Sequence, residues 1–509
     1  ITCRDWSSDV CSSDLNIITN DPKDFNGVKA SLTAGGFNTY IGALTASYYS
    51  DDSDLGALVS MRYYSSEKAD LKLEKGDNNW TDKLENFEKD LAIDCKFNYK
   101  NLLVGANFQN KQASRSTNFK SVNTNYLDYG SNWNMYFLNI YSKYSHVFSD
   151  KFLFNSQIYY RNTTLADNSI SYTLDTAQVG QYRPNDQVGA ELILQFVPIE
   201  ELNITGGFLF EYEELAKGFS TTMSTSKDDK PPIPPRPDLE HNRLFSSYIQ
   251  LQYEFLNYFN IIGGARIDHS SYYDDVITPR TGLIFSYGNF NTKLLYNEAF
   301  RAPKPWDYLY GKGNNELKPE TIKSFEIDID YLIIKELSIN LSYYNNQYSN
   351  LIVTNSVVNM TVNEDIIKTN GLELSANLLW NDLNLYFNYT YNESTDEFGN
   401  EIPEIAKHSL NSGFHYNILK NLIINLRCNI AGERKNPSII ESIGNNIIEP
   451  AYVLTSVITY KDFYGFDFSL MVNNLFDTEY YHPSNRPPSR YRQPQRTILF
   501  KINYSLNLF

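Results

Sequence analysis

The sequence predicts an all-β fold, a 22-stranded antiparallel transmembrane β-barrel. Apolar and polar residues alternate in segments of about ten residues, from Val28 to the end of the chain. The alternation is near perfect in Phe325–Tyr331, where every second residue is apolar. Successive strand side chains point to opposite faces, so each segment has one apolar and one polar face. A barrel in a bilayer needs both, because lipid lies outside and a polar lumen lies inside.

The composition agrees with a membrane barrel and excludes several other classes. Mean hydropathy is −0.43, and no run of 18 apolar residues could form a spanning helix. Aromatic residues make up 15% of the chain, with 40 tyrosines, which suit the boundary between lipid and water. A soluble β-sandwich or propeller also alternates, but no repeat of either kind is visible. The net charge of −16 argues against nucleic acid as a partner.

The lengths of the connections give the strand number. Bacterial barrels join their strands by short periplasmic turns and longer extracellular loops. Ten short turns are expected near residues 51–53, 99–101, 149–150, 198–200, 257–258, 287–289, 333–335, 380–382, 418–420 and 461–463. Eleven loops alternate with them, and all but those near Gly36 and Tyr273 are long and polar. Ten turns and eleven loops predict 22 strands.

The first fifteen residues are predicted to be an artefact. Arg4–Leu15 resembles the translation of a common short-read sequencing adapter, and it resembles neither a signal peptide nor a strand. Cys3 and Cys11 lie in or beside this stretch. Cys95 and Cys428 fall on apolar strand faces, so we expect them to face lipid and to form neither a disulfide nor a metal site.

Several motifs resemble those of the TonB-dependent outer-membrane receptors. The main one runs from Glu298 to Glu326, and Asn370–Leu374, Asn473–Asp477 and Arg496 follow it in the family's order. At position 495 the family usually has glycine, and this chain has glutamine. The motif residues are Phe300, Arg301, Ala302, Pro303, Leu317, Lys318, Pro319, Glu320 and the terminal Phe509.

The resemblance also divides the chain into parts. Asn16–Asn20 is similar to the last strand of the family's plug domain, so residues 16–25 are expected to be a plug remnant. Residues 26–509 would then be the whole barrel, without the plug and its TonB-contacting segment. In the last strand Ile498, Phe500, Ile502, Tyr504, Leu506 and Leu508 form the outward set, which leaves Phe509 one place out of register. A bulge near the end would restore the phase.

The resemblance implies active uptake of a scarce nutrient through the outer membrane of a Gram-negative cell. Energy would come from the TonB–ExbB–ExbD complex, acting through the plug, and the solute would be a ferric siderophore. Cobalamin uptake and a passive porin-like channel are the alternatives. Residues 301–320 contain no histidine, which argues against haem. No nucleophile and base are arranged for catalysis, so we expect neither an enzyme nor a resident cofactor.

Two loops supply the candidate ligand residues. The first contains Arg301 and three aromatic residues that could stack on a ligand or pack the loop, namely Trp306, Tyr308 and Tyr310. The last loop contains arginines that could attract an anionic siderophore, bind lipopolysaccharide phosphates or pair with acidic neighbours, namely Arg486, Arg490, Arg492 and Arg496. Glu326, Asp328 and Asp330 should face the lumen, where a solvated, salt-bridged wall is favoured over a cation site.

Overall fold

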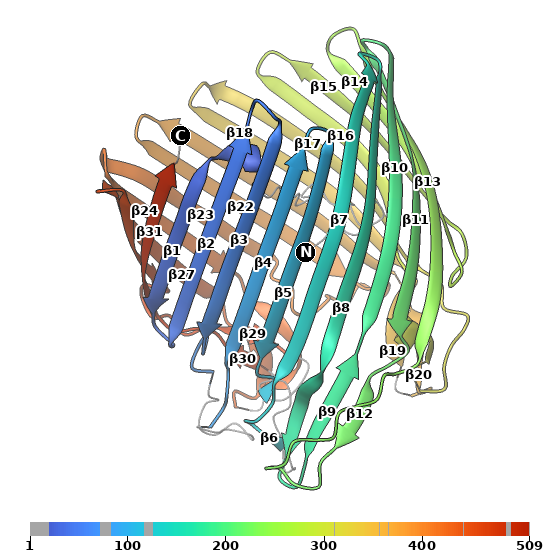
Figure 1. Cartoon of the computed structure of the whole chain (residues 1–509), viewed down its shortest axis with the longest axis vertical. Coiled ribbons are helices and arrows are strands. Elements are labelled where there is room, and N and C mark those ends of the chain that lie inside the picture. The colour runs from blue at the N-terminus through green and yellow to red at the C-terminus, as the bar shows by residue number, and fades with distance from the viewer. Residues whose placement is uncertain are drawn as a thin grey trace.

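The protein is a closed antiparallel barrel of 22 strands, as the sequence predicts (Figure 1). The computed structural model describes residues 20–71, 83–116, 126–309, 311–355, 357–364, 366–440, 442–484 and 490–507. One sheet contains 25 strands, and three of them (β6, β9 and β12) only extend it beyond the barrel. The other 22 form a ring that closes where β31 pairs with β1 over Gly27–Gly35.

The barrel strands are long, and most have 12 to 17 residues. In order around the ring they are β1 (Gly27–Gly35), β2 (Thr39–Ser50), β3 (Leu55–Ser66), β4 (Glu88–Tyr99), β5 (Leu102–Ala113), β7 (Trp133–Ser149), β8 (Phe152–Leu174), β10 (Asn185–Ile199), β11 (Leu202–Ala216), β13 (Leu239–Phe255), β14 (Phe259–Ser270), β15 (Val276–Tyr287), β16 (Phe290–Arg301), β17 (Glu320–Ile334), β18 (Leu337–Ser349), β21 (Ile367–Trp380), β22 (Leu383–Thr395), β23 (His408–Leu419), β24 (Leu422–Ala431), β27 (Ala451–Phe463), β28 (Phe466–Asn473) and β31 (Thr497–Asn507).

All ten predicted turns lie within a few residues of their expected places, at one end of the barrel. The eleven loops lie at the other end, which we call the loop end. The sequence predicts these loops only as polar segments. In the structure six of them contain short strands, and a seventh contains a helix. These elements are β6 (Tyr126–Leu127), β9 (Gln178–Arg183), β12 (Ser220–Met223), α1 (Pro305–Leu309), β19 (Leu351–Asn355), β20 (Met360–Glu364), β25 (Arg434–Ile440), β26 (Asn445–Ile448), β29 (Tyr481–Pro483) and β30 (Arg490–Arg492).

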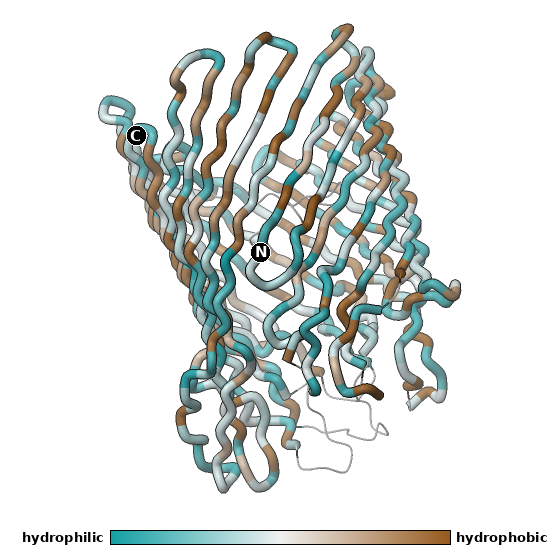
Figure 2. The backbone as a smooth tube through the Cα atoms, turned by 90° about the vertical axis from the view of Figure 1, so that its right-hand side faces the viewer, coloured by the Kyte–Doolittle hydropathy of each residue, from teal (hydrophilic) through white to brown (hydrophobic). Residues whose placement is uncertain are grey.

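The two faces of the wall differ in polarity, as the alternation predicts. Apolar and polar residues alternate along the strands in Figure 2. Phe208 points outward and is 62% exposed, whereas Tyr248, on the lumen side of the next strand, is 5% exposed. Polar side chains gather on the lumen side, where Arg266 is bonded to Asp268 at 2.7 Å and to Ser246. The described part of the chain contains no helix long and apolar enough to cross a bilayer.

The three acidic residues of β17 form part of the lumen wall, as expected. Ser342 donates a hydrogen bond to Asp328, and Asn340 donates one to Asp330 at 2.7 Å. Lys293 lies 3.9 Å from Asp330, a long ion pair. The expectation of a salt-bridged wall is therefore only partly correct, because the Ser342 hydroxyl binds one oxygen of Asp328 and the Asn340 amide binds one oxygen of Asp330.

Lumen-facing tyrosine rings lie flat against glycines of neighbouring strands. A β-carbon on Gly207 would lie 2.2 Å from Cζ of Tyr248, and the same arrangement joins Tyr159 to Gly189 and Tyr344 to Gly371. The Tyr248 hydroxyl donates to Glu191 at 3.0 Å. Because glycine has no side chain there, the ring can cover the backbone and seal the wall.

The chain before β1 is bound to the inner wall at the turn end. Nζ of Lys96 donates to the Asn20 carbonyl at 2.6 Å, and Nδ2 of Asn98 donates to Asp21 at 2.9 Å. The 3₁₀ turn η1 (Pro22–Asp24) follows, and Pro22 is buried against Gly56. Residues 1–19, which include the predicted adapter and the first four residues of the predicted plug remnant, lie outside the described residues.

The closing strand β31 follows the predicted register. Ile498, Phe500 and Leu506 are 44–51% exposed on the outer face. The pairing of β31 with β1 and β28 has no register shift between Thr497 and Asn507. Phe509 lies outside the described residues, so its phase stays a prediction. Cys95 and Cys428 are free thiols and occupy outward positions of β4 and β24.

The tyrosine–glycine contact predicts a difference between two adjacent glycines. Gly207→Ala should lower the free energy of unfolding by about 1–3 kcal/mol, because the new methyl group displaces the Tyr248 ring. Gly206→Ala is the matched control, since its β-carbon would face outward with its nearest atom at 3.7 Å. Urea unfolding of the barrel in phospholipid vesicles measures both. Equal effects of the two substitutions would contradict this account.

Candidate functional site at the loop end of the lumen

One loop, residues 302–319, folds over the inner wall and shapes the mouth of the lumen. It begins and ends at an ion pair, because Arg301 at the end of β16 contacts Glu320 at the start of β17, with Nη2 2.5 Å from Oε1. The same carboxylate oxygen accepts the Ile352 amide at 2.7 Å. Glu320 therefore connects this loop to the β19–β20 hairpin.

Most of the motif residues found in the sequence hold this loop in place. Asn363 accepts the Lys318 amide at 2.8 Å and donates to the Lys318 carbonyl at 2.9 Å. Leu317 and Pro319 are buried on either side. Phe300 packs on Tyr273, and Ala302 and Pro303 line a small cavity beside α1. Their described contacts are structural, which explains the motif without giving it a ligand.

Trp306 lies at the centre of a cationic cavity of about 270 Å³. The guanidinium carbon of Arg183 lies 3.7 Å from the centre of its ring, and Nζ of Lys304 lies 4.9 Å away. Arg161 comes from the inner face of β8 and packs its guanidinium on Tyr159 at 4.1 Å. We call this space the cationic cavity, and its characteristic lining residues are Arg161, Arg183, Lys304 and Trp306.

Positive charge is in excess in the cationic cavity. Asp186 is the only acidic residue in the lining, against three cations, and it also pairs with Arg236 at 3.6 Å. Burial lowers the pKa of Arg183, and the nearby Asp307 opposes that shift. The Nε atoms of Arg161 and Arg183 are buried without a hydrogen-bond partner among the described residues. Desolvated cations with free donors favour an anionic ligand.

The three aromatic residues predicted in this loop have different places. Trp306 lines the cationic cavity, as the stacking hypothesis requires. Tyr308 is 6% exposed, its hydroxyl donates to the Tyr272 carbonyl at 3.1 Å, and its ring meets Tyr272 edge to face. Burial and the carboxylates of Asp307 and Asp274 raise the pKa of Tyr308 to about 12. Tyr308 therefore packs the loop, and Tyr310 lies outside the described residues.

The described arginines of the last loop contact this loop and the neighbouring β25–β26 hairpin, where Arg490 donates to Ser442 at 3.4 Å. The Arg490 guanidinium lies 3.9 Å from the centre of the Tyr481 ring, and the residue is 9% exposed. Arg492 pairs with Glu479 at 3.1 Å, the closure onto an acidic neighbour that was one of the alternatives. Arg486 lies outside the described residues. These contacts do not test ligand binding by this loop, which stays a prediction.

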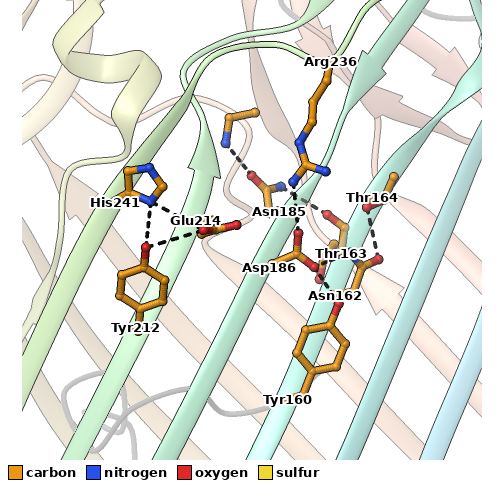
Figure 3. A network of polar contacts seen from close by, with 11 residues as sticks. Tyr160, Asn162, Thr163, Thr164, Asn185, Asp186, Tyr212, Glu214, Arg236 and His241 are labelled. Atoms are coloured by element: carbon orange, nitrogen blue, oxygen red, sulfur yellow. Dashed lines mark hydrogen bonds and ion pairs between the residues drawn. The ribbon is translucent and has the colours of Figure 1, made fainter.

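Outside the barrel, a polar belt marks where the same strands leave the lipid. Along the outer face of β8, Ile158 is 62% exposed and is followed by Tyr160 and Asn162. Figure 3 shows this belt: Tyr160 and Asn162 donate to Asp186, and Tyr212 contacts His241 and Glu214. The cationic cavity lies at the same level on the inner face, beyond the apolar band.

Sequence reasoning missed three of the four residues of the cationic cavity. Arg161, Arg183 and Lys304 are not among the candidate ligand residues that the sequence indicates. Arg161 lies on β8 and Arg183 at the end of β9, which pairs with β8 at Leu165, and loop 302–319 brings Trp306 onto Arg183. The only usable signal was a long polar segment, 165–183, with a single arginine at its end.

The 22-stranded barrel, with loop 302–319 folded over the mouth of its lumen, is typical of one class of protein, the large outer-membrane barrels of solute uptake. Residues 24–475 match the family model described as TonB dependent receptor-like, beta-barrel. The chain belongs to this family of transporters and receptors, which is not one of enzymes, and it lies in the outer membrane of a Gram-negative cell.

Two sequence relatives and one solved structure illustrate the similarity. The iron-regulated outer membrane virulence protein of Vibrio cholerae serotype O1 is 24% identical over 275 residues, covering 47% of this chain and 41% of that protein. The probable TonB-dependent siderophore receptor PirA of Acinetobacter baumannii is 23% identical over 325 residues, covering 52% and 43%. The FrpB iron transporter of Neisseria meningitidis has a TM-score of 0.76 at 15% identity, covering 96% and 83%. The matches to the two sequence relatives thus span about two fifths of the length of each relative.

The role of Glu320 can be tested by limited proteolysis. Glu320→Gln should weaken the ion pair to Arg301 by about 1 kcal/mol, so loop 302–319 should be cleaved about five times faster. Glu316→Gln changes an exposed carboxylate of the same loop and should leave the rate unchanged. Equal cleavage rates in both variants would show that Glu320 does not hold the loop.

Proposed function

We propose that the protein takes up an anionic ferric siderophore through the outer membrane. The observation that carries this proposal is the cationic cavity, where Arg161, Arg183 and Lys304 surround Trp306 at the mouth of the lumen. The names of the V. cholerae and A. baumannii relatives, one iron-regulated and one a probable siderophore receptor, support iron as the cargo.

The chemistry of the cavity suits a flat, electron-rich anion. The guanidinium of Arg183 covers one side of the Trp306 ring, so a ligand ring can stack against the same group of side chains. Iron-chelating oxygens carry the negative charge that Arg161 and Lys304 would neutralise. A neutral solute would gain little from three cations, so the cavity favours a siderophore over cobalamin.

Release into the periplasm is proposed to need the TonB–ExbB–ExbD complex, acting on a plug that precedes the barrel. Residues 16–25 are proposed to be the end of that plug. The contacts of Lys96 with Asn20 and of Asn98 with Asp21 support this, because they hold the chain inside the lumen just before β1. The preceding chain would then start from the inner wall.

Tryptophan fluorescence can test the binding step. The refolded full chain should show quenching of Trp306 by an anionic ferric catecholate complex, and Arg183→Ala should raise the Kd about tenfold or more, equal to about 1.4 kcal/mol. Arg243→Ala is the matched control, because Arg243 is an exposed arginine near the loop end of β13 that does not line the cationic cavity. Trp306→Phe should remove the part of the quenching that comes from Trp306, while the other four tryptophans keep their fluorescence.

Two results would contradict the proposal. If Arg243→Ala weakened binding as much as Arg183→Ala, the effect would be general electrostatics and not the cavity. If a neutral corrinoid quenched Trp306 as strongly as the ferric complex, cobalamin would become the better assignment. Raising the ionic strength should weaken binding of the ferric complex only.

A further inference from the structure

A second cavity lies on the wall opposite the cationic cavity. It has a volume of about 360 Å³ and is built on the inner faces of β22, β23, β24 and β27. Strands β10 and β24 are eleven steps apart in either direction around the ring of 22, so the two cavities face each other across the lumen. We call this one the amide cavity, after its wall of asparagines.

The hydrogen-bonding side chains in the wall of the amide cavity are uncharged and unpaired, and they lie among apolar residues such as Ala451 and Val453. Its hydrogen-bonding side chains are Asn388, Thr390, Ser409, Asn411 and Asn429. Among the described residues, none of these five side chains has a hydrogen-bond partner, and Oδ1 of Asn411 is fully buried without one. Elsewhere on the lumen wall, asparagines bind one another, as Asn139 does when its amide donates to Asn107 at 3.1 Å. Donors and acceptors of the amide cavity are therefore available to a ligand.

A single cation roofs the cavity. Arg434, at the start of β25, donates from Nη2 to the Tyr481 carbonyl at 2.8 Å, and its Nε is buried without a partner. Burial lowers the pKa of Arg434. Partial burial and the charge of Arg434 also lower the pKa of His482, so that ring is neutral at pH 7. Tyr480 completes the roof, which therefore carries one positive charge.

We infer that the amide cavity binds a polyhydroxylated monocarboxylate, such as a sugar acid. The carboxylate would take the free edge of the Arg434 guanidinium, where Nε and an Nη atom can donate in parallel. The hydroxyl groups would bind the asparagine, serine and threonine side chains of the wall. The cavity is within the size range of small-molecule sites. Its one cation and five neutral partners contrast with the three cations around Trp306.

This inference does not rest on the proposed iron uptake. The two cavities share no residue, and their ligands differ in charge and in hydroxyl content. One can therefore fail while the other holds, and separate variants report on each.

Saturation-transfer NMR on the full chain in detergent micelles tests the inference, with D-gluconate as the probe. Gluconate should bind, whereas sorbitol, which lacks the carboxylate, and acetate, which lacks the hydroxyls, should bind at least about tenfold more weakly. Arg434→Gln should reduce gluconate binding to the level of sorbitol. Because this change also removes a contact with the β29–β30 hairpin, a second variant is needed.

Asn411→Leu is that second variant, since Asn411 has no partner whose loss could disturb the fold. It should weaken both gluconate and sorbitol severalfold. Asn377→Leu is the matched control, a lumen-side asparagine of β21 near the turn end, outside the cavity. The inference is overturned if gluconate does not bind, if Asn377→Leu acts like Asn411→Leu, or if Arg183→Ala removes gluconate binding while Arg434→Gln leaves it intact.

Discussion

Closure of the hydrogen-bond ladder is the constraint on which the rest of the structure depends. In hydrocarbon an unpaired backbone group costs several kcal/mol, so a membrane sheet has to close on itself. Here β1 and β31 close it over nine residue pairs, from Gly27 with Asn507 to Gly35 with Leu499. A ring of 22 strands is wide, and its lumen has to be shaped by loops folded inward from one end. Both cavities are consequences of that width.

The wall of such a ring can be predicted from sequence because its rules are local. Alternation assigns Phe208 to lipid and Tyr248 to the lumen, and polar connections locate the ten turns within a few residues. The short strands inside the loops escaped prediction, because hairpins such as β25–β26 have polar segments without a clear period. The motif at Phe300–Glu320 identified the family, but its residues hold a loop and do not identify a ligand.

The candidate site was predicted only in part, for a physical reason. Trp306 was expected from its loop, yet its partners Arg161 and Arg183 lie more than 120 residues earlier in the chain. They meet because loop 302–319 lies against the inner side of β8 and β9, which no local pattern encodes. Arg434 was missed for the same reason. Arg490 and Arg492 were predicted from their charge; Arg490 packs on Tyr481 and Arg492 pairs with Glu479, and their role toward a ligand stays a prediction.

The central claim is that the lumen mouth receives an anionic iron complex beside Trp306. The most direct measurement is a crystal structure of the chain soaked with a ferric catecholate, with diffraction data collected at the iron absorption edge. The account predicts an anomalous peak in the cationic cavity, with ligand oxygens within hydrogen-bond distance of Arg161, Arg183 or Lys304. An iron peak only outside the lumen, or only against the opposite wall beneath Arg434, would contradict it.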